Sequence, residues 1–165
     1  MNNTVVWIFG QPGSGKTTFG KEFVKQKYAE GDHSWINIDA DVLRMSMANN
    51  GYDRLGRMNN ILAAVQITRF LNLSGYNVVS SFVTPYAEMR NIIFRSLVRV
   101  MFVYLQSSEV RGREDKFVND FEYPDNDASI ARLVKFDTAT LTTTEMYNYI
   151  IKLPFFASYG NERQN

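Results

Sequence analysis

The sequence predicts an α/β fold of three layers, in which helices cover both faces of a mainly parallel, five-stranded sheet. Short apolar runs that resemble strands alternate along the chain with helical patterns, which is the order expected of βαβ units. A glycine-rich segment, Gly10 to Thr18, stands between the first strand-like run and the first helical pattern. The length of 165 residues suits one domain, residues 1–165.

The predicted strands are rich in Val, Ile, Phe and Trp, which favour extended backbone. The first run, Thr4 to Phe9, is apolar after its first residue, as expected for a strand buried on both faces. Strands are expected at residues 4–9, 35–38, 77–83, 100–105 and 132–136.

The predicted helices follow from apolar residues at helical spacing, most clearly between Leu55 and Ile67. Gly75 is expected to end this long helix, because glycine adopts the left-handed conformation there at little cost. Pro85 is expected to end the third strand and to open the next helix. Helices are expected at residues 16–28, 41–48, 56–73, 86–97 and 142–151.

The segment Gly10 to Thr18 matches G-x-x-x-x-G-K-[ST], the P-loop, and has the strand before it and the helix after it that this motif requires. Its glycines let backbone N–H groups turn toward a phosphate, and the helix start adds the positive end of its dipole. Lys16 is placed to reach the β- and γ-phosphates, and the Thr17 hydroxyl to bind Mg²⁺. Since no guanine-reading Asn-Lys-x-Asp element is evident, we expect ATP with Mg²⁺, held by Gly10, Gly13, Ser14, Gly15, Lys16, Thr17 and Thr18.

Two carboxylates, Asp39 and Asp41, follow the second predicted strand. Ligands of open α/β sheets bind beyond the carboxyl ends of the strands, so both residues are expected beside the P-loop. One could accept the proton of an acceptor hydroxyl, or both could hold Mg²⁺ through water. Helix capping by Asp39 is an alternative that is compatible with catalysis. The single histidine, His33, lies in a polar loop and is expected to be an exposed bystander.

Arginines and hydroxyl residues follow these carboxylates. Arg44 lies one turn after Asp41, and Arg57 and Asn60 share a helix face. Arginine suits bidentate recognition of phosphate or sulfate oxygens, although Arg57 could also be a solvated surface charge. The third strand ends in hydroxyl residues where many P-loop proteins carry an acid, so Mg²⁺ is expected to depend on Thr17, the phosphates and water, with an aspartate behind them.

Residues 107–131 are polar and are expected to form a lid over the phosphates, with a plain surface loop as the alternative. Phe117 and Phe121 either stack on a base or close the lid onto the core. Residues 161–165 are expected to be a disordered tail.

Several segments, read in order, resemble the adenylylsulfate (APS) kinase family. After the P-loop they are Asp39 to Arg44, Gly51-Tyr52, Arg57 to Ile61, Ser81 to Tyr86 and Phe136 to Leu141. The resemblance implies transfer of the ATP γ-phosphate to the 3′-hydroxyl of APS, giving PAPS, and it favours a homodimer. It also implies that Asp41 is the base or an acceptor-side ligand. Together with the P-loop and the position after the second strand, this gives Lys16, Asp41 and Asp39 as the expected catalytic residues. By the same resemblance the acceptor nucleotide would be faced by Asp41, Arg44, Tyr52, Arg57, Asn60, Val83, Thr84, Phe117 and Phe121.

The chain departs from the family pattern within the Asp39 segment, at Ala40 and Val42, and in the lid, where most of a basic stretch is missing. A kinase for another nucleoside, for a nucleotide or for a hydroxymethylated DNA base is therefore an alternative, and a virus-encoded modifying kinase is one form that this alternative takes. A non-catalytic nucleotide-binding switch is a second alternative. The paired aspartates and the arginines after them argue against a switch, because a switch needs no acceptor site.

The composition of the chain excludes several kinds of binding partner and of chemistry. The net charge of +1 provides no overall field that would attract nucleic acid or a membrane, so nucleic acid is expected at most as an acceptor. The absence of cysteine excludes disulfides, thiolate metal sites and cysteine nucleophiles. No apolar run reaches the ~18 residues of a membrane span. We expect a cytoplasmic protein.

Overall fold

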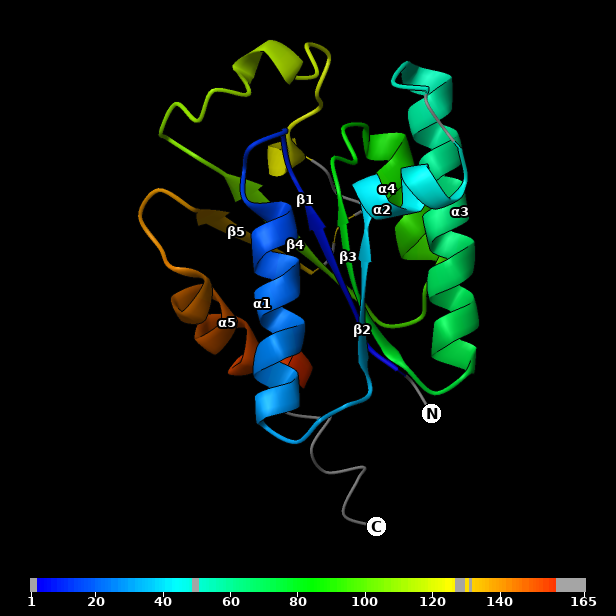
Figure 1. Cartoon of the computed structure of the whole chain (residues 1–165), viewed down its shortest axis with the longest axis vertical. Coiled ribbons are helices and arrows are strands. Elements are labelled where there is room, and N and C mark those ends of the chain that lie inside the picture. The colour runs from blue at the N-terminus through cyan, green and yellow to red at the C-terminus, as the bar shows by residue number, and fades with distance from the viewer. Residues whose placement is uncertain (1–2, 49–50, 127–129, 131, 157–165) are drawn as a thin grey trace.

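A computed structural model describes residues 3–48, 51–126, 130 and 132–156. Its five strands are all parallel and lie in the order β2-β3-β1-β4-β5, between two layers of helices (Figure 1). The predicted three-layer α/β fold is therefore confirmed. The carboxyl ends of all five strands lie at one edge of the sheet, because parallel strands share one direction.

The helices and strands lie within two residues of their predicted bounds. In chain order they are β1 Val5–Phe9, α1 Lys16–Ala29, β2 Trp35–Asp39, α2 Ala40–Ser46, α3 Arg54–Leu73, β3 Asn77–Phe82, α4 Ala87–Ser96, β4 Val100–Gln106, β5 Leu133–Asp137 and α5 Thr143–Ile151. Two short 3₁₀ turns, η1 Glu114–Lys116 and η2 Pro124–Asn126, lie between β4 and β5.

Helices α1 and α5 cover one face of the sheet (Figure 1). Phe23 of α1 is the centre of an aromatic group there, with its ring 5.2 Å from Trp35 and 5.0 Å from Tyr147. Helices α2, α3 and α4 cover the other face, together with Val118 and Phe121 from the predicted lid. All strand residues of β1 are buried, as the continuous apolar run predicted.

The corner between β3 and α4 differs from the prediction for Pro85. Strand β3 ends at Phe82, and α4 begins at Ala87 with Tyr86 as its N-cap, so Pro85 neither ends the strand nor opens the helix. Thr84 causes the difference, because its left-handed backbone (φ +45°) turns the chain before the proline. Gly75, with φ +95°, follows the end of α3 as predicted.

The predicted lid, residues 107–131, is described up to residue 126 and at residue 130. Its residues 107–126 lie beyond the carboxyl ends of the central strands (Figure 1). The predicted tail, residues 161–165, lies outside the described residues. Within the described part of the chain, none of the helices has the length and apolar character needed to span a membrane.

Close packing of α1 on the sheet predicts the effect of a substitution at Gly20. A Cβ atom there would lie 2.4 Å from Ser81 Oγ and 3.0 Å from Asn37 Oδ1. We expect Gly20→Ala to lower the free energy of unfolding by about 1–2 kcal/mol, since overpacking outweighs the better helix propensity of alanine. Urea unfolding measures this difference. In a Ser81→Ala background the loss should be smaller, and an equal loss in both backgrounds would contradict the proposed clash.

Candidate active site

The P-loop of this chain has the backbone that its sequence predicted. Gly15 is the N-cap of α1 with φ +92°, and no side chain caps the helix, so its first N–H groups remain available to an anion. Gly10 cannot carry a side chain, because a Cβ atom would lie 2.1 Å from the Leu105 carbonyl oxygen. The loop is thus shaped to hold phosphate with its main chain.

A short hydrogen bond joins the P-loop to β2. Thr17 Oγ1 donates to Asp39 Oδ2 at 2.7 Å, while Asp39 Oδ1 accepts from the Asp41 backbone N–H at 3.0 Å. Asp39 therefore caps α2, as one alternative predicted, and also holds the predicted metal-binding hydroxyl. In the sheet, Asp39 of β2 pairs with Ser81 of β3, which in turn pairs with β1, the strand before the P-loop. Ser81 is a small residue and so leaves space for Thr17 beside Asp39.

Lys16 lies inside the loop, where its Nζ donates to the Gln11 carbonyl at 2.7 Å and to Ser14 Oγ at 3.4 Å. Burial lowers the pKa of Lys16 to about 8, while Asp41 and Asp39 oppose this shift and Arg113 adds to it. The two aspartates are thus close enough to Lys16 to act on its charge. The sequence prediction that these residues meet at one site is in agreement with this geometry.

A cavity of about 930 Å³ opens at this edge of the sheet, near the upper end of the range of roughly 300–1,000 Å³ that is typical of small-molecule sites. Two carboxylates, Asp39 and Asp41, face six cationic side chains in its lining, namely Lys16, Arg44, Arg57, Arg111, Arg113 and Lys116. This excess of positive charge suits anionic ligands.

The end of the cavity away from the P-loop combines cations with an aromatic ring. The Arg44 guanidinium lies 4.4 Å from the centre of the Tyr52 ring, and that of Arg57 lies 5.9 Å from it. Arg44 is buried and donates to the Gly51 carbonyl at 2.6 Å. Burial also lowers the pKa of Arg57, which remains a cation at neutral pH. This geometry favours a ligand role for Arg57 over a solvated surface charge.

Asn60 adds a polar group to the same end of the cavity. It is 3 % exposed, and its Oδ1 atom is buried without a hydrogen-bond partner. An unpaired buried polar atom costs free energy, on the order of 1–3 kcal/mol. A ligand that reorients or pairs this amide would recover that cost, which is why Asn60 is a candidate for recognition.

The wall opposite α2 is formed by the turn after β3. Thr84 is held by a hydrogen bond from Trp7 Nε1 to its Oγ1 at 3.0 Å and by one from Arg90 to its carbonyl at 3.2 Å. Its left-handed backbone costs about 1–3 kcal/mol, a strain that the surrounding contacts must offset. The Val83 carbonyl accepts from Gly10 N–H at 3.3 Å, so this wall is connected to the P-loop.

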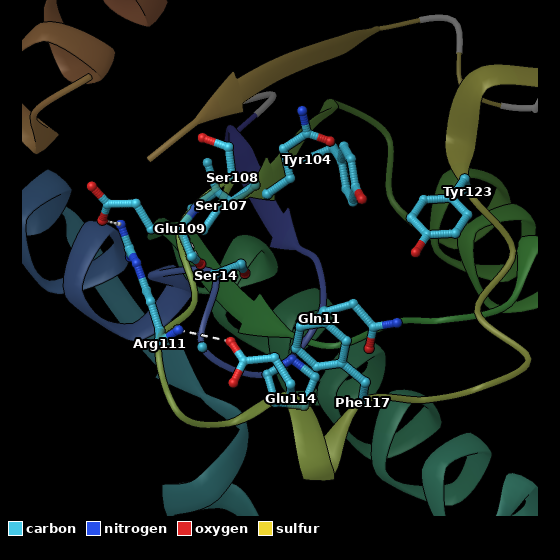
Figure 2. Close-up of a pocket in the computed structure, with 14 residues that line it drawn as sticks. Gln11, Ser14, Tyr104, Ser107, Ser108, Glu109, Arg111, Glu114, Phe117 and Tyr123 are labelled. Atoms are coloured by element: carbon cyan, nitrogen blue, oxygen red, sulfur yellow. Dashed lines mark hydrogen bonds and ion pairs between the residues drawn. The ribbon is translucent and has the colours of Figure 1, made fainter. Parts of the chain in front are cut away.

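A second cavity of about 280 Å³ lies on the lid side of the P-loop, and Figure 2 shows its lining. It shares Pro12, Gly13 and Arg111 with the large cavity. Its other lining includes the aromatic side chains of Tyr104, Phe117 and Tyr123, and the carboxylates of Glu109 and Glu114. Burial raises the pKa of Tyr104 to about 12.

Arg111 is held between the two cavities. Its backbone N–H donates to Glu114 Oε1 at 2.7 Å, and its guanidinium donates to the Thr138 carbonyl at 2.8 Å (Figure 2 shows the Glu114 bond). Arg113 packs against the P-loop: a Cβ atom added to Gly13 would lie only 3.3 Å from the Cβ atom of Arg113. Arg111 and Arg113 thus lie beside the P-loop, although this chain lacks most of the basic stretch that the family has in its lid.

Most of the predicted site residues meet at the large cavity, but not all of them. Its lining includes Gly13, Gly15, Lys16, Thr17, Thr18, Asp39, Asp41, Arg44, Tyr52, Arg57, Asn60, Val83 and Thr84. Gly10 packs closely against the Leu105 carbonyl and lines neither cavity, and Ser14 lines the smaller cavity. Of the two lid phenylalanines, Phe117 lines the smaller cavity and Phe121 is buried in the core at 6 % exposure. Phe121 therefore closes the lid onto the core, which is the second of its two predicted roles.

Sequence reasoning did not assign Arg111, Arg113 and Lys116 to the site. The sequence shows these three basic residues after the fourth strand. Which of them face the P-loop depends on the η1 turn, which the sequence did not predict. His33 is exposed, with its ring 5.0 Å from Tyr28, and lies in the turn before β2, at the edge of the sheet opposite the site.

The fold and the site together define a P-loop nucleotide-binding protein. The profile of the family described as "Adenylylsulphate kinase" matches residues 2–116. The chain belongs to this adenylylsulphate kinase family, so the resemblance inferred from the sequence is confirmed.

Curated relatives include two different kinases. A cytidine diphosphoramidate kinase of Campylobacter jejuni is 31% identical over 108 residues, covering 64% of this chain and 61% of the relative. A probable adenylyl-sulfate kinase of Aeropyrum pernix is 32% identical over 119 residues, covering 68% of this chain and 64% of the relative. The matches thus span less than two thirds of either relative.

Solved structures support the fold. The APS kinase of Mycobacterium tuberculosis, solved in complex with AMPPNP and APS, has a TM-score of 0.76 at 17% identity and covers 91% of this chain and 96% of its own. A gluconokinase from Sinorhizobium meliloti has a TM-score of 0.62 at 18% identity, covering 99% and 96%.

The low pKa of Lys16 predicts how phosphate affinity depends on pH. Below about pH 7 the ammonium is charged, and above about pH 8 it is increasingly neutral, so it attracts phosphate less. We expect the affinity for AMPPNP with Mg²⁺ to fall as the pH rises through about 8, by up to about ten-fold per pH unit. Calorimetric titrations between pH 6.5 and 9.5 measure this. Lys16→Arg should abolish the dependence, and an identical profile in that variant would contradict the assignment.

Proposed function

We propose that this chain is an ATP-dependent kinase that transfers the γ-phosphate to a hydroxyl group of a small anionic nucleotide. The single observation that carries the proposal is the large cavity, whose lining combines the P-loop, the carboxylate of Asp41 and the arginines Arg44 and Arg57. Membership of the adenylylsulphate kinase family supports the same activity.

The donor half of the site is formed by the P-loop and the lid. The main-chain N–H groups at the start of α1 and the Lys16 ammonium would bind the ATP phosphates. Arg113 and Lys116 lie in the same cavity and would balance the charge of the transferring group. These groups supply electrostatic stabilisation, which is the main contribution that a protein makes to phosphoryl transfer.

The acceptor half is formed by α2 and α3. Arg44 and Arg57 would bind the anionic part of the acceptor, and Tyr52 would stack on its base. The acceptor oxygen attacks the γ-phosphorus, the bond from that phosphorus to the bridging oxygen breaks, and ADP leaves. Asp41 would take the proton of the acceptor hydroxyl.

The residues present fit a magnesium ion. Thr17 and Asp39 provide hard oxygen atoms 2.7 Å apart, which Mg²⁺ prefers over nitrogen or sulfur. Among the residues that the structure describes, no group of three or more His, Cys, Asp or Glu side chains gathers, so phosphate and water would complete the shell. When bound, the ion would neutralise charge on the β- and γ-phosphates.

Within this activity, we propose the 3′-hydroxyl of APS as the acceptor, with PAPS as the product. The family and the adenylyl-sulfate kinase relative support this choice. A cytidine nucleotide is the second candidate, because the cytidine diphosphoramidate kinase relative matches this chain at similar identity. Both acceptors carry a base and an anionic group, which Tyr52 and the two arginines suit equally.

Release of ADP from ATP with a panel of acceptors tests the proposal. The panel contains APS, cytidine diphosphate, an uncharged nucleoside and DNA with hydroxymethylated bases. We expect APS to give the highest kcat/KM. Preference for cytidine diphosphate would select the second candidate, and preference for the nucleoside or DNA would overturn a small anionic acceptor. Slow hydrolysis without transfer to any acceptor would indicate a switch.

Arg57 and Arg54 provide a matched test of the acceptor end. Both are on α3, but Arg54 lies over the Tyr86 ring and pairs with Glu88, outside the large cavity. We expect Arg57→Ala to raise the acceptor KM on the order of ten-fold, the loss of one charge-assisted contact, with the ATP KM unchanged. Arg54→Ala should leave the acceptor KM within about two-fold. Equal effects of the two substitutions would argue against the assigned acceptor end.

Asp41→Asn tests the proton acceptor. The amide keeps the shape of the side chain and the backbone N–H that Asp39 accepts, but it cannot take a proton. We expect kcat to fall by roughly 10²–10⁴-fold, while the affinity for AMPPNP stays within a few-fold. Asp115→Asn, on the exposed η1 turn, is the control and should change neither quantity. Full transfer by Asp41→Asn would remove this residue from the mechanism.

A further inference from the structure

Gln11 belongs to the P-loop, but its side chain is bound to the lid. Its Nε2 donates to the Val118 carbonyl at 3.0 Å, and its Oε1 accepts from the Val118 N–H at 2.9 Å. The side-chain amide of Gln11 thus forms hydrogen bonds with both the N–H and the C=O of Val118, as the backbone of a neighbouring strand would. Figure 2 shows Gln11 in the lining of the smaller cavity, where Phe117, the neighbour of Val118, is also found.

The main chain of Gln11 touches the residue that reaches the phosphates. Lys16 Nζ donates to the Gln11 carbonyl at 2.7 Å. A triphosphate on the P-loop would compete with this carbonyl for the ammonium. Gln11 is therefore in contact with Lys16 through its backbone and with the lid through its side chain.

The lid segment of residues 117–123 is in turn bound to the turn after β3. Val118 and Phe121 are 7 % and 6 % exposed and pack in the core. Glu122 N–H donates to the Pro85 carbonyl at 2.8 Å, and the Tyr86 hydroxyl donates to Asp120 Oδ1 at 3.1 Å. Pro85 lines the large cavity, so this segment joins the P-loop to the acceptor wall.

The residues just before this segment carry the lid cations. Arg113 and Lys116 line the large cavity, and Lys116 is two residues from Val118. The position of Val118 consequently limits where these cations can lie. The hydrogen-bonded pair at Val118 therefore helps to hold these cations in the lining of the large cavity.

We propose that Gln11 is a positioning residue that couples phosphate binding in the P-loop to the placement of the lid. The inference rests on the proposed function for its ligand, ATP. A docked lid brings Arg113 and Lys116 to the phosphates and so favours nucleotide binding. By thermodynamic linkage, bound nucleotide must then favour the docked lid by the same factor.

Hydrogen exchange at the Val118 amide tests this coupling, because that N–H lies outside every helix and strand and its partner is Gln11. Gln11→Met keeps the length of the side chain but cannot form the pair. Gln106→Met is the matched control, since Gln106 lines the same small cavity and its exposed side chain makes no hydrogen bond to any residue that the structure describes. We expect roughly ten-fold faster exchange at Val118 in Gln11→Met, from the loss of two hydrogen bonds, and no change in Gln106→Met.

The second part of the test measures the effect of bound nucleotide on exchange at the Val118 amide, and it can be made on the wild-type chain as well as on the variant. With AMPPNP and Mg²⁺, exchange at Val118 should slow in the wild type and slow less in Gln11→Met. The ATP KM of Gln11→Met should rise on the order of ten-fold with kcat within about two-fold, a split that a loss of folded protein would not produce.

The outcomes separate the coupling from the proposed function. Slower exchange at the Gly15 and Lys16 amides with nucleotide, but not at Val118 in the wild type, would overturn the coupling. Unchanged exchange in Gln11→Met, or an equal change in Gln106→Met, would overturn it as well. The expected exchange pattern without phosphate transfer to any acceptor would support the coupling and count against the proposed function alone.

Discussion

The hydrogen bond between Thr17 and Asp39 is the interaction on which the arrangement of the site depends. It joins the first turn of α1, which covers one face of the sheet, to the end of β2, which is an edge strand of that sheet. Level with Asp39, β3 has a small residue, Ser81, whose hydroxyl donates to the Lys16 carbonyl at 3.2 Å, so the start of α1 is bonded to both strands. These two bonds hold the P-loop beside the carboxylates, and both line one cavity.

Charge then divides this cavity into two functional ends. Lys16 and the lid cations lie around the P-loop, whereas Arg44 and Arg57 lie around Tyr52. Burial lowers the pKa of Lys16 by more than the two aspartates raise it, and Arg113 adds a smaller lowering. An anionic ligand on the P-loop would favour the charged form of this ammonium.

Part of the segment predicted to be a lid is packed in the hydrophobic core, through Val118 and Phe121. Phe121 packs with its ring 6.2 Å from that of Tyr104, and Val118 is paired with Gln11. Residues 111–116, by contrast, are exposed and held by a few hydrogen bonds. A short lid of this kind places cations through an anchored segment rather than through a long basic stretch.

The sequence by itself determined the strands, the helices and the P-loop, because these depend on local apolar periodicity and on glycines whose backbone few other residues can adopt. It also located Asp39, Asp41, Arg44, Arg57 and Asn60, since the ends of parallel strands meet at one edge of the sheet. Only the tertiary structure decided the contacts of Thr84, Phe117, Phe121 and Gln11. Their partners are distant in sequence, and neither a left-handed threonine nor a side-chain bond to a loop backbone leaves a periodic signal that could be read beforehand.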